Sequence, residues 1–144
     1  MKLFCTEEFK IQFEKLITKK SYKDLEQDII DFFFDKAIAD VCSGTRLNAS
    51  NETPYIKKRL NGSGGFRLYY YILIKNDCLY LMFVHPKKGV YGSPNITDES
   101  KSYLYKQVLH CIKENELFEV LRDERGGKLI FKKVEPDTKL LLKK

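Results

Sequence analysis

The stretch FRLYYYILIK, residues 66–75, decides the fold together with CLYLMFVH, residues 78–85, which follows it after Asn76-Asp77. Both segments are rich in β-branched and aromatic residues, and a two-residue polar turn separates them. They therefore predict an antiparallel hairpin of two long strands. Tyr55–Leu60, with the sequence YIKKRL, predicts a third strand, which the glycine-rich turn 61–65 joins to the hairpin.

Alternation of side chains assigns the two faces of this sheet. One set in the long strand is nearly all apolar, and we expect it to pack on helices: Phe66, Leu68, Tyr70, Ile72 and Ile74. We expect the opposite, open face to carry Arg67, Tyr69 and Tyr71, together with Tyr55, Lys57 and Arg59 of the preceding strand. Lys58 would then point inward, and a bulge, an edge position or a shifted register would resolve that conflict.

Helical spacing of apolar residues appears on both sides of these strands. Residues 6–18 predict a helix capped by Thr6, and a second helix opens at Ser21 and should stop before Ser43-Gly44. Thr97 is a suitable cap for a third helix.

A terminal hairpin is predicted over residues 117–134. The fold class is therefore α+β, with the N-terminal helices packed on one face of a curved antiparallel sheet, a third helix and an extra C-terminal hairpin. We expect a single domain over residues 1–138 and a frayed tail over 139–144.

Positive charge is concentrated in one part of the chain. Residues 54–91 contain seven Lys and Arg and a single acidic residue, Asp77. Their net charge is therefore +6, which equals the formal net charge of the whole chain. Aromatic residues are interleaved with these cations, a pattern that suits RNA or single-stranded nucleic acid. A basic face that only keeps the protein soluble, or one that meets an acidic protein, remains an alternative.

Length and composition exclude several classes of protein. The chain has 144 residues, 43% hydrophobic and 32% charged, which is ordinary for a globular domain and not for a disordered chain. Its apolar runs are too short to span a bilayer, and Met1-Lys2-Leu3-Phe4-Cys5 lacks a signal-peptide core. We therefore expect a cytoplasmic protein, in which the four cysteines are reduced and serve as small apolar residues.

The basic strands also contain residues suited to phosphodiester chemistry. Cations can hold a phosphate and stabilise its extra charge in the transition state, and a histidine such as His85 can transfer a proton near neutral pH. We assign Arg67 and Lys57 or Lys58 to the phosphate and His85 to proton transfer. This region has no cluster of carboxylates for magnesium, so the sequence disfavours a metal-dependent nuclease.

These strands resemble the RelE/HigB toxins of type II toxin–antitoxin modules, within the RelE/ParE superfamily. The resemblance is carried by Lys57-Lys58-Arg59-Leu60, by Gly64-Gly65-Phe66-Arg67-Leu68-Tyr69-Tyr70 and by the strand at 79–84. Phe66 stands where the family usually has Tyr. The opening Phe4-Cys5-Thr6-Glu7-Glu8-Phe9 is similar to the family's first strand and helix start, and the match covers roughly residues 1–115. The extra hairpin at 117–134 makes this chain longer than typical members.

The resemblance implies an mRNA interferase that cleaves mRNA in the ribosomal A site, with the RNA 2′-OH as nucleophile and without a metal or another cofactor. It further implies that an antitoxin protein holds the enzyme inactive. Arg67 matches the family's arginine at the scissile phosphate, whereas the basic strand matches only as a cluster. His85 and Tyr91 lie where members carry variable catalytic residues.

We expect the RNA to be bound by Arg59, Tyr69, Tyr71, Lys87, Lys88 and Tyr91. Two other hypotheses remain open at this point. One is a non-catalytic RNA-binding or ribosome-binding domain on the same fold, and the other is a protein-interaction domain that holds an acidic partner.

Overall fold

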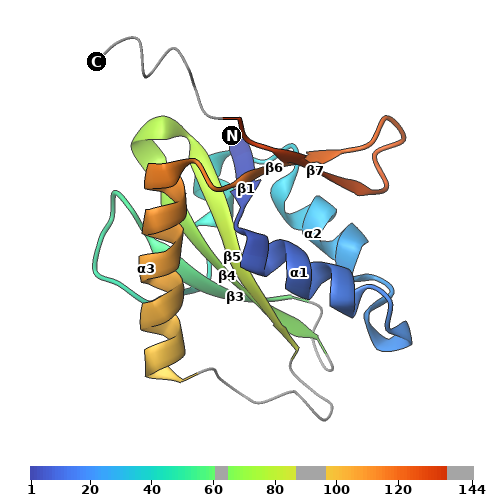
Figure 1. Cartoon of the computed structure of the whole chain (residues 1–144), viewed down its shortest axis with the longest axis horizontal. Helices are drawn as coiled ribbons and strands as arrows, with labels where there is room; N and C mark the ends of the chain where they lie inside the picture. Colours follow the sequence, from blue (N-terminus) through green and yellow to red (C-terminus); the bar gives the residue numbers. More distant parts are fainter. Residues whose placement is uncertain (61–64, 87–96, 136–144) are drawn as a thin grey trace.

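The structure is a computed structural model that describes residues 1–60, 65–86 and 97–135 (Figure 1). Its elements in chain order are β1 (Lys2–Cys5), α1 (Glu7–Leu16), α2 (Leu25–Phe33), β2 (Thr45–Arg46), β3 (Tyr55–Leu60), β4 (Phe66–Leu73), β5 (Cys78–Pro86), α3 (Asp98–Glu114), β6 (Phe118–Arg122) and β7 (Leu129–Lys133). The described part of the chain is thus an α+β fold with three α-helices and one seven-stranded sheet. The sequence predicts the α+β class and the three helices, but not β2 or the parallel pairing of β1 with β5.

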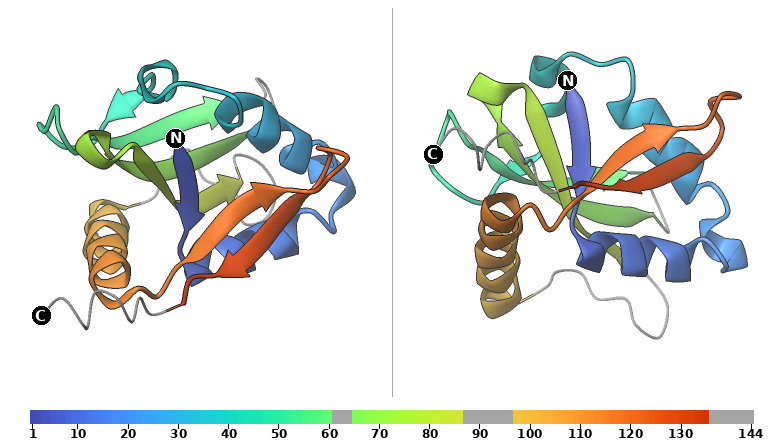
Figure 2. Two further views of the ribbon diagram at one scale, coloured as in Figure 1. Left: turned by 90° about the horizontal axis from the view of Figure 1, so that it is seen from above. Right: turned by 45° about the horizontal axis from the view of Figure 1, so that its top comes forward.

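The sheet has the strand order β2-β3-β4-β5-β1-β6-β7 (Figure 2). All neighbouring strands are antiparallel except β1 and β5, which are parallel. The hairpin of β4 and β5 lies at the centre, and Asp77 makes its turn with a left-handed φ of 56°. The predicted hairpin over 117–134 is confirmed as β6 and β7, and it extends the sheet beyond β1.

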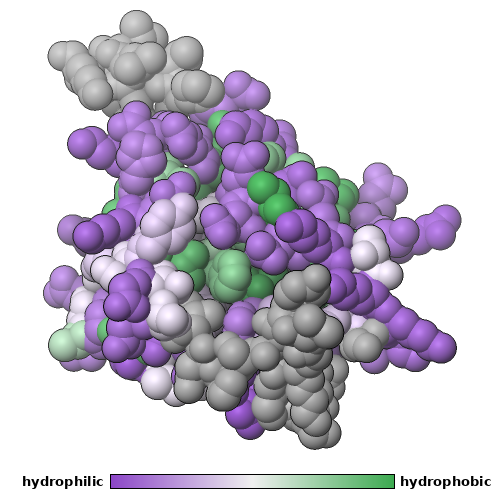
Figure 3. Space-filling model, turned by 60° about the horizontal axis from the view of Figure 1, so that its bottom comes forward, coloured by the Kyte–Doolittle hydropathy of each residue, from purple (hydrophilic) through white to green (hydrophobic). Residues whose placement is uncertain are grey.

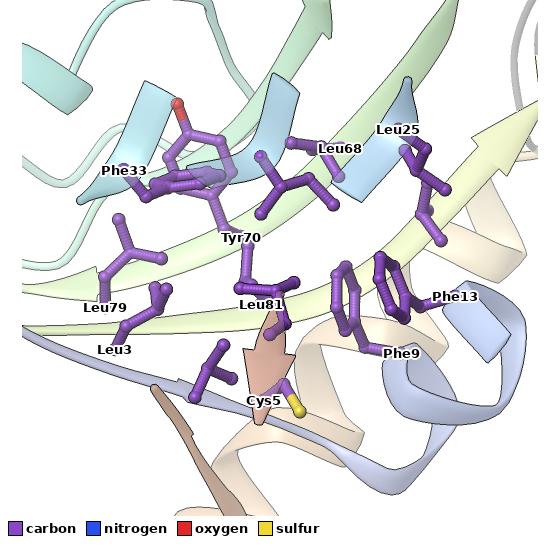
Figure 4. Close-up of a cluster of buried hydrophobic side chains, with 14 of the residues drawn as sticks. Leu3, Cys5, Phe9, Phe13, Leu25, Phe33, Leu68, Tyr70, Leu79 and Leu81 are labelled. Carbon is purple, nitrogen blue, oxygen red and sulfur yellow. The ribbon is translucent and has the colours of Figure 1, made fainter. Parts of the chain in front are cut away.

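The first face of the sheet packs against α1 and α2 and forms the larger core (Figure 4). Phe66, Leu68, Tyr70 and Ile72 of β4 all lie in it and are at most 1% exposed, as alternation predicts. The prediction is wrong for Ile74, because β4 ends at Leu73 and Ile74 lies in the following 3₁₀ turn, 37% exposed. Tyr70 packs edge-on against Phe33 of α2, and its hydroxyl donates to the carbonyl oxygen of Val41 at 2.8 Å.

Helix α3 covers the part of the second face around Tyr69 and Tyr71, so the prediction that this part is open is wrong. The apolar stripe of α3, formed by Leu104, Val108 and Cys111, packs on Tyr69, Tyr71 and other residues of this face. Figures 1 and 2 show α3 on the side of the sheet opposite α2. The stripe can be recognised in the sequence, but the sequence does not show which face it covers.

The N-terminal elements differ from the predictions in length. Thr6 caps α1 as predicted, since its side-chain oxygen accepts from the backbone N–H of Phe9. The second helix is shorter than predicted: a 3₁₀ turn precedes α2, and Asp35, with φ of 59°, adopts a left-handed conformation soon after Phe33. A single helix reaching Ser43 is therefore excluded, because a left-handed residue interrupts helical hydrogen bonding.

Candidate nucleic-acid interface

A row of three ionisable residues crosses the sheet on the face that carries α3. Arg59 of β3 lies opposite Arg67 of β4, and Arg67 lies opposite His85 of β5. In the next row, Lys57 is opposite Tyr69, which is opposite Phe83. The structure therefore brings together four of the residues that the sequence assigns to phosphate binding and catalysis: Lys57, Arg59, Arg67 and His85.

A β-bulge places His85 in this row. Tyr69 pairs with Phe83 but Tyr70 pairs with Leu81, so Met82 is an extra residue on β5. Strict alternation from Leu81 would put His85 on the first face, with the apolar core. The extra residue reverses the alternation, and His85 consequently shares a face with Arg67.

The side chain of Thr6 supports the bulge. Its hydroxyl donates to the carbonyl oxygen of Met82 at 3.2 Å, and its backbone N–H donates to the carbonyl oxygen of Leu81 at 3.0 Å. Thr6 is 2% exposed and also caps α1. One residue thus connects the start of α1 to the irregular position that sets the orientation of His85.

Arg67 is a buried cation. Its side chain is 6% exposed, and its Nη1 is buried without a hydrogen-bond partner among the residues that the structure describes. No carboxylate in the described ranges forms an ion pair with it. A buried guanidinium normally has a hydrogen-bonded anion beside it, so this arrangement favours binding of an external anion.

Further positive charge surrounds Lys57. Its pKa is lowered from 10.5, first because burial disfavours the charged amine and then because Lys101 of α3, Arg67 and Arg59 repel it. These four side chains, from two strands and one helix, therefore form one cationic cluster. Arg and Lys clusters of this kind stabilise phosphate groups and the charge that develops on them during transfer reactions.

Lys58 does not belong to this cluster. It pairs with Leu68, which lies in the core beneath α1 and α2, and its ammonium group lies 5.5 Å from the ring centroid of Phe32. Strand β2 pairs with β3 at Ile56 and Lys57, so Lys58 lies just past the end of β2, at the edge of the sheet. From this edge its amine reaches the side of Phe32 without a change of register. The structure therefore separates Lys58 from the residues predicted to hold the phosphate, whereas Lys57 lies beside Arg59 and Arg67 on the same face.

The predicted aromatic contacts change as well. Tyr69 and Tyr71 are 0% and 4% exposed beneath α3, so their rings are not available to stack on RNA bases in this structure. The remaining predicted contacts, Lys87, Lys88 and Tyr91, lie outside the described residues.

A pocket of about 1150 Å³ opens next to His85. Phe83, His85 and Pro86 of β5 line it, together with residues of α1 and of the first turns of α3. Figure 3 shows this side of the molecule, where apolar side chains lie in the middle and hydrophilic ones surround them. The amino-acid sequence alone does not reveal this pocket. Its one local sign is that Ile11 and Tyr103, two large hydrophobic residues, lie outside the buried stripes of their helices.

The other chemical features of the described residues are simple. No three of their His, Cys, Asp and Glu side chains come together as a metal site, and none of their helices has the length and apolar character needed to cross a membrane. The cysteines are free, and burial raises the pKa of Cys5 well above its usual range.

Comparison with protein-family models and with curated protein sequences found no match to this chain.

Proposed function

We propose that this protein is a RelE/HigB-like toxin, a ribosome-dependent mRNA endoribonuclease that a cognate antitoxin holds inactive. The observation that carries the proposal is the row formed by Arg59, Arg67 and His85. In it a buried arginine, with no ion-pairing carboxylate among the described residues, lies opposite a histidine. The chain order also supports it, since two helices precede three antiparallel strands that present the basic residues. The proposed activity requires a cytoplasmic location, with the ribosomes.

The cationic cluster suits cleavage by the RNA's own 2′-OH. In this reaction the 2′ oxygen forms a bond to phosphorus and the bond from phosphorus to the 5′ oxygen breaks. A proton leaves the 2′-OH and another is delivered to the departing 5′ oxygen. Arg67 and Lys57 stabilise the additional negative charge on the phosphate, and His85 transfers one of the protons.

Growth and product analysis test this function. Induced wild-type protein should arrest growth and cut translated mRNA, leaving a 2′,3′-cyclic phosphate or 3′-phosphate and a 5′-hydroxyl. Arg67→Lys, which keeps the charge but not the planar guanidinium, should relieve the arrest. Arg125→Ala is the matched control, because this exposed arginine lies in the turn between β6 and β7. Ends with 5′-phosphate and 3′-hydroxyl would refute the mechanism.

A specific observation favours a second candidate, a non-catalytic domain that binds RNA, the ribosome or an acidic protein. Tyr69 and Tyr71, which would stack on bases in the catalytic hypothesis, are covered by α3. A cationic face whose neighbouring strand tyrosines are buried suits a partner recognised mainly by charge. Wild-type protein that is harmless at high expression without an antitoxin, yet still binds ribosomes, would decide for this candidate.

A further inference from the structure

The pocket beside His85 and the cationic row are two parts of one surface. His85 belongs to both: it is opposite Arg67 in the sheet and it also lines the pocket. Neighbouring strands lie about 4.8 Å apart, so Arg67 is one strand away from the pocket and Arg59 is two strands away. A ligand with an anionic group at Arg67 can therefore place its next group in the pocket.

The walls of the pocket are suited to a flat ring with polar edges. The rings of Phe83 and His85 are nearly parallel, with centroids 6.1 Å apart and an angle of 25° between their planes. Ile11 of α1 and Tyr103 of α3 are exposed hydrophobic residues that also line the pocket. Gln12 lies among them and offers both a hydrogen-bond donor and an acceptor.

We propose that this pocket is a nucleobase subsite, which binds the base of an RNA nucleotide whose phosphate is held by Arg59 and Arg67. The inference rests on the proposed function, because it takes RNA as the ligand. The chemistry of the surface identifies the ligand. The positive row lies next to an aromatic pocket, and in a nucleotide a phosphate lies next to a base. At about 1150 Å³ the pocket is large for a small-molecule site, so it has room for a whole nucleoside.

The subsite also compensates for the burial of Tyr69 and Tyr71. With those rings beneath α3, the aromatic surface near the cations in the described part of the chain includes Tyr103, at 53% exposure, and the half-buried Phe83. Splayed bases of single-stranded RNA stack on such rings. Tyr103 is thus a residue that can stack on a base, although it makes no contribution to the phosphate site.

A titration with two probes tests the subsite. The first probe is a trinucleotide of 2′-O-methyl RNA, which cannot be cleaved by 2′-OH attack, and the second has the same phosphates but no bases. Tyr103→Ala should weaken binding of the trinucleotide about tenfold, the effect of losing one base–aromatic stack. It should leave binding of the abasic probe unchanged. Backbone amide NMR shifts should locate the base next to Gln12 and Phe83.

Two matched variants complete the experiment. Leu109→Ala, at a residue of α3 that is 40% exposed and does not line the pocket, should bind both probes like the wild type. Arg59→Ala, at an exposed residue, should weaken binding of both probes.

Each of three other outcomes would refute the subsite. If Arg59→Ala weakens both probes while Tyr103→Ala binds the trinucleotide as the wild type does, the subsite is refuted and RNA binding stands. If the wild-type protein binds neither probe, both the subsite and the proposed RNA-directed function fail. An equal loss with both probes in Tyr103→Ala would also overturn the subsite, because the effect would not come from the base.

Discussion

Arg67 and His85 lie directly opposite each other on β4 and β5, and they are only 6% and 8% exposed. The pairing is possible because Met82 is inserted between the two regular halves of β5. An arginine in this position destabilises the folded state, since its Nη1 has no hydrogen-bond partner among the described residues. Within the described residues this position therefore costs stability, which agrees with the proposed role of Arg67 in binding an anion.

Replacement of Arg67 by Met should stabilise the protein. A buried, unsatisfied donor costs about 1–3 kcal/mol, and methionine fills a similar space without a charge. We expect the free energy of unfolding to rise by roughly 1–2 kcal/mol in urea denaturation. The same variant should lose binding of RNA. A decrease in stability would show that the guanidinium is already satisfied inside the folded protein.

Lys57 should make RNA binding sensitive to alkaline pH. Its folded pKa lies below 10.5 because of burial and of repulsion from Lys101, Arg67 and Arg59. A bound phosphate favours the charged amine, so affinity is complete below the lowered pKa and decreases as the pH rises through it. Lys57→Arg should abolish this decrease, since arginine stays charged throughout this range.

Binding of the uncleavable trinucleotide can be followed by fluorescence anisotropy from neutral pH to pH 10.5. Other lysines titrate in both proteins, so the difference between wild type and variant isolates Lys57. Identical profiles would mean that Lys57 does not contact the phosphate.

The hydroxyl of Thr6 should be required for the position of His85. Thr6→Val keeps the shape of the side chain but removes the cap on Phe9 N–H and the bond to the Met82 carbonyl. We expect it to lower the free energy of unfolding by about 1–3 kcal/mol. Thr6→Ser keeps both bonds and should retain most of the stability.

A readout at the site separates this positioning role from a general loss of stability. NMR signals of the His85 ring should shift in Thr6→Val and stay at their wild-type positions in Thr6→Ser. Unchanged ring signals in the valine variant would show that the bulge persists without Thr6.

Ionic strength should reveal how many phosphates the cluster contacts. For single strands, the logarithm of the binding constant falls with the logarithm of salt concentration, with a slope of about −0.7 per phosphate neutralised. If Lys57, Arg59 and Arg67 each neutralise one phosphate, they contribute about −2 to the slope. Arg59→Ala should reduce the slope by about 0.7, whereas Arg125→Ala should not change it. A flat dependence in the wild type would show that the cluster does not touch the RNA backbone.

The sequence predicts much of the fold because its local signals are strong. Thr6 and Thr97 cap the helices as predicted, and alternation correctly places Leu68 and Tyr70 in the core. Strand β1 has only four residues, and its partner β5 begins more than 70 positions later, so local periodicity cannot identify it. Only the family resemblance suggested a strand at that position.

The site was harder to predict because it depends on contacts between distant segments. The bulge at Met82 leaves no signal, since Met82 and Phe83 are both apolar and either could continue the alternation. The packing of α3 over Tyr69 depends on which face of the sheet this helix packs against, and its own sequence does not determine that face. Lys58 was recognised as a conflict, but its position beside Phe32 is a contact that only the folded chain reveals.

The place of β1 inside the sheet has a consequence for how the chain reaches its native state. This strand precedes the other described strands along the chain, yet it pairs on one side with Leu79 and its neighbours and on the other with Phe118. Contacts between such distant residues slow folding, because a long loop must close before they form. The described sheet is therefore complete only once β7, which pairs with β6, has been synthesised, and any activity that depends on the whole sheet begins only after that point.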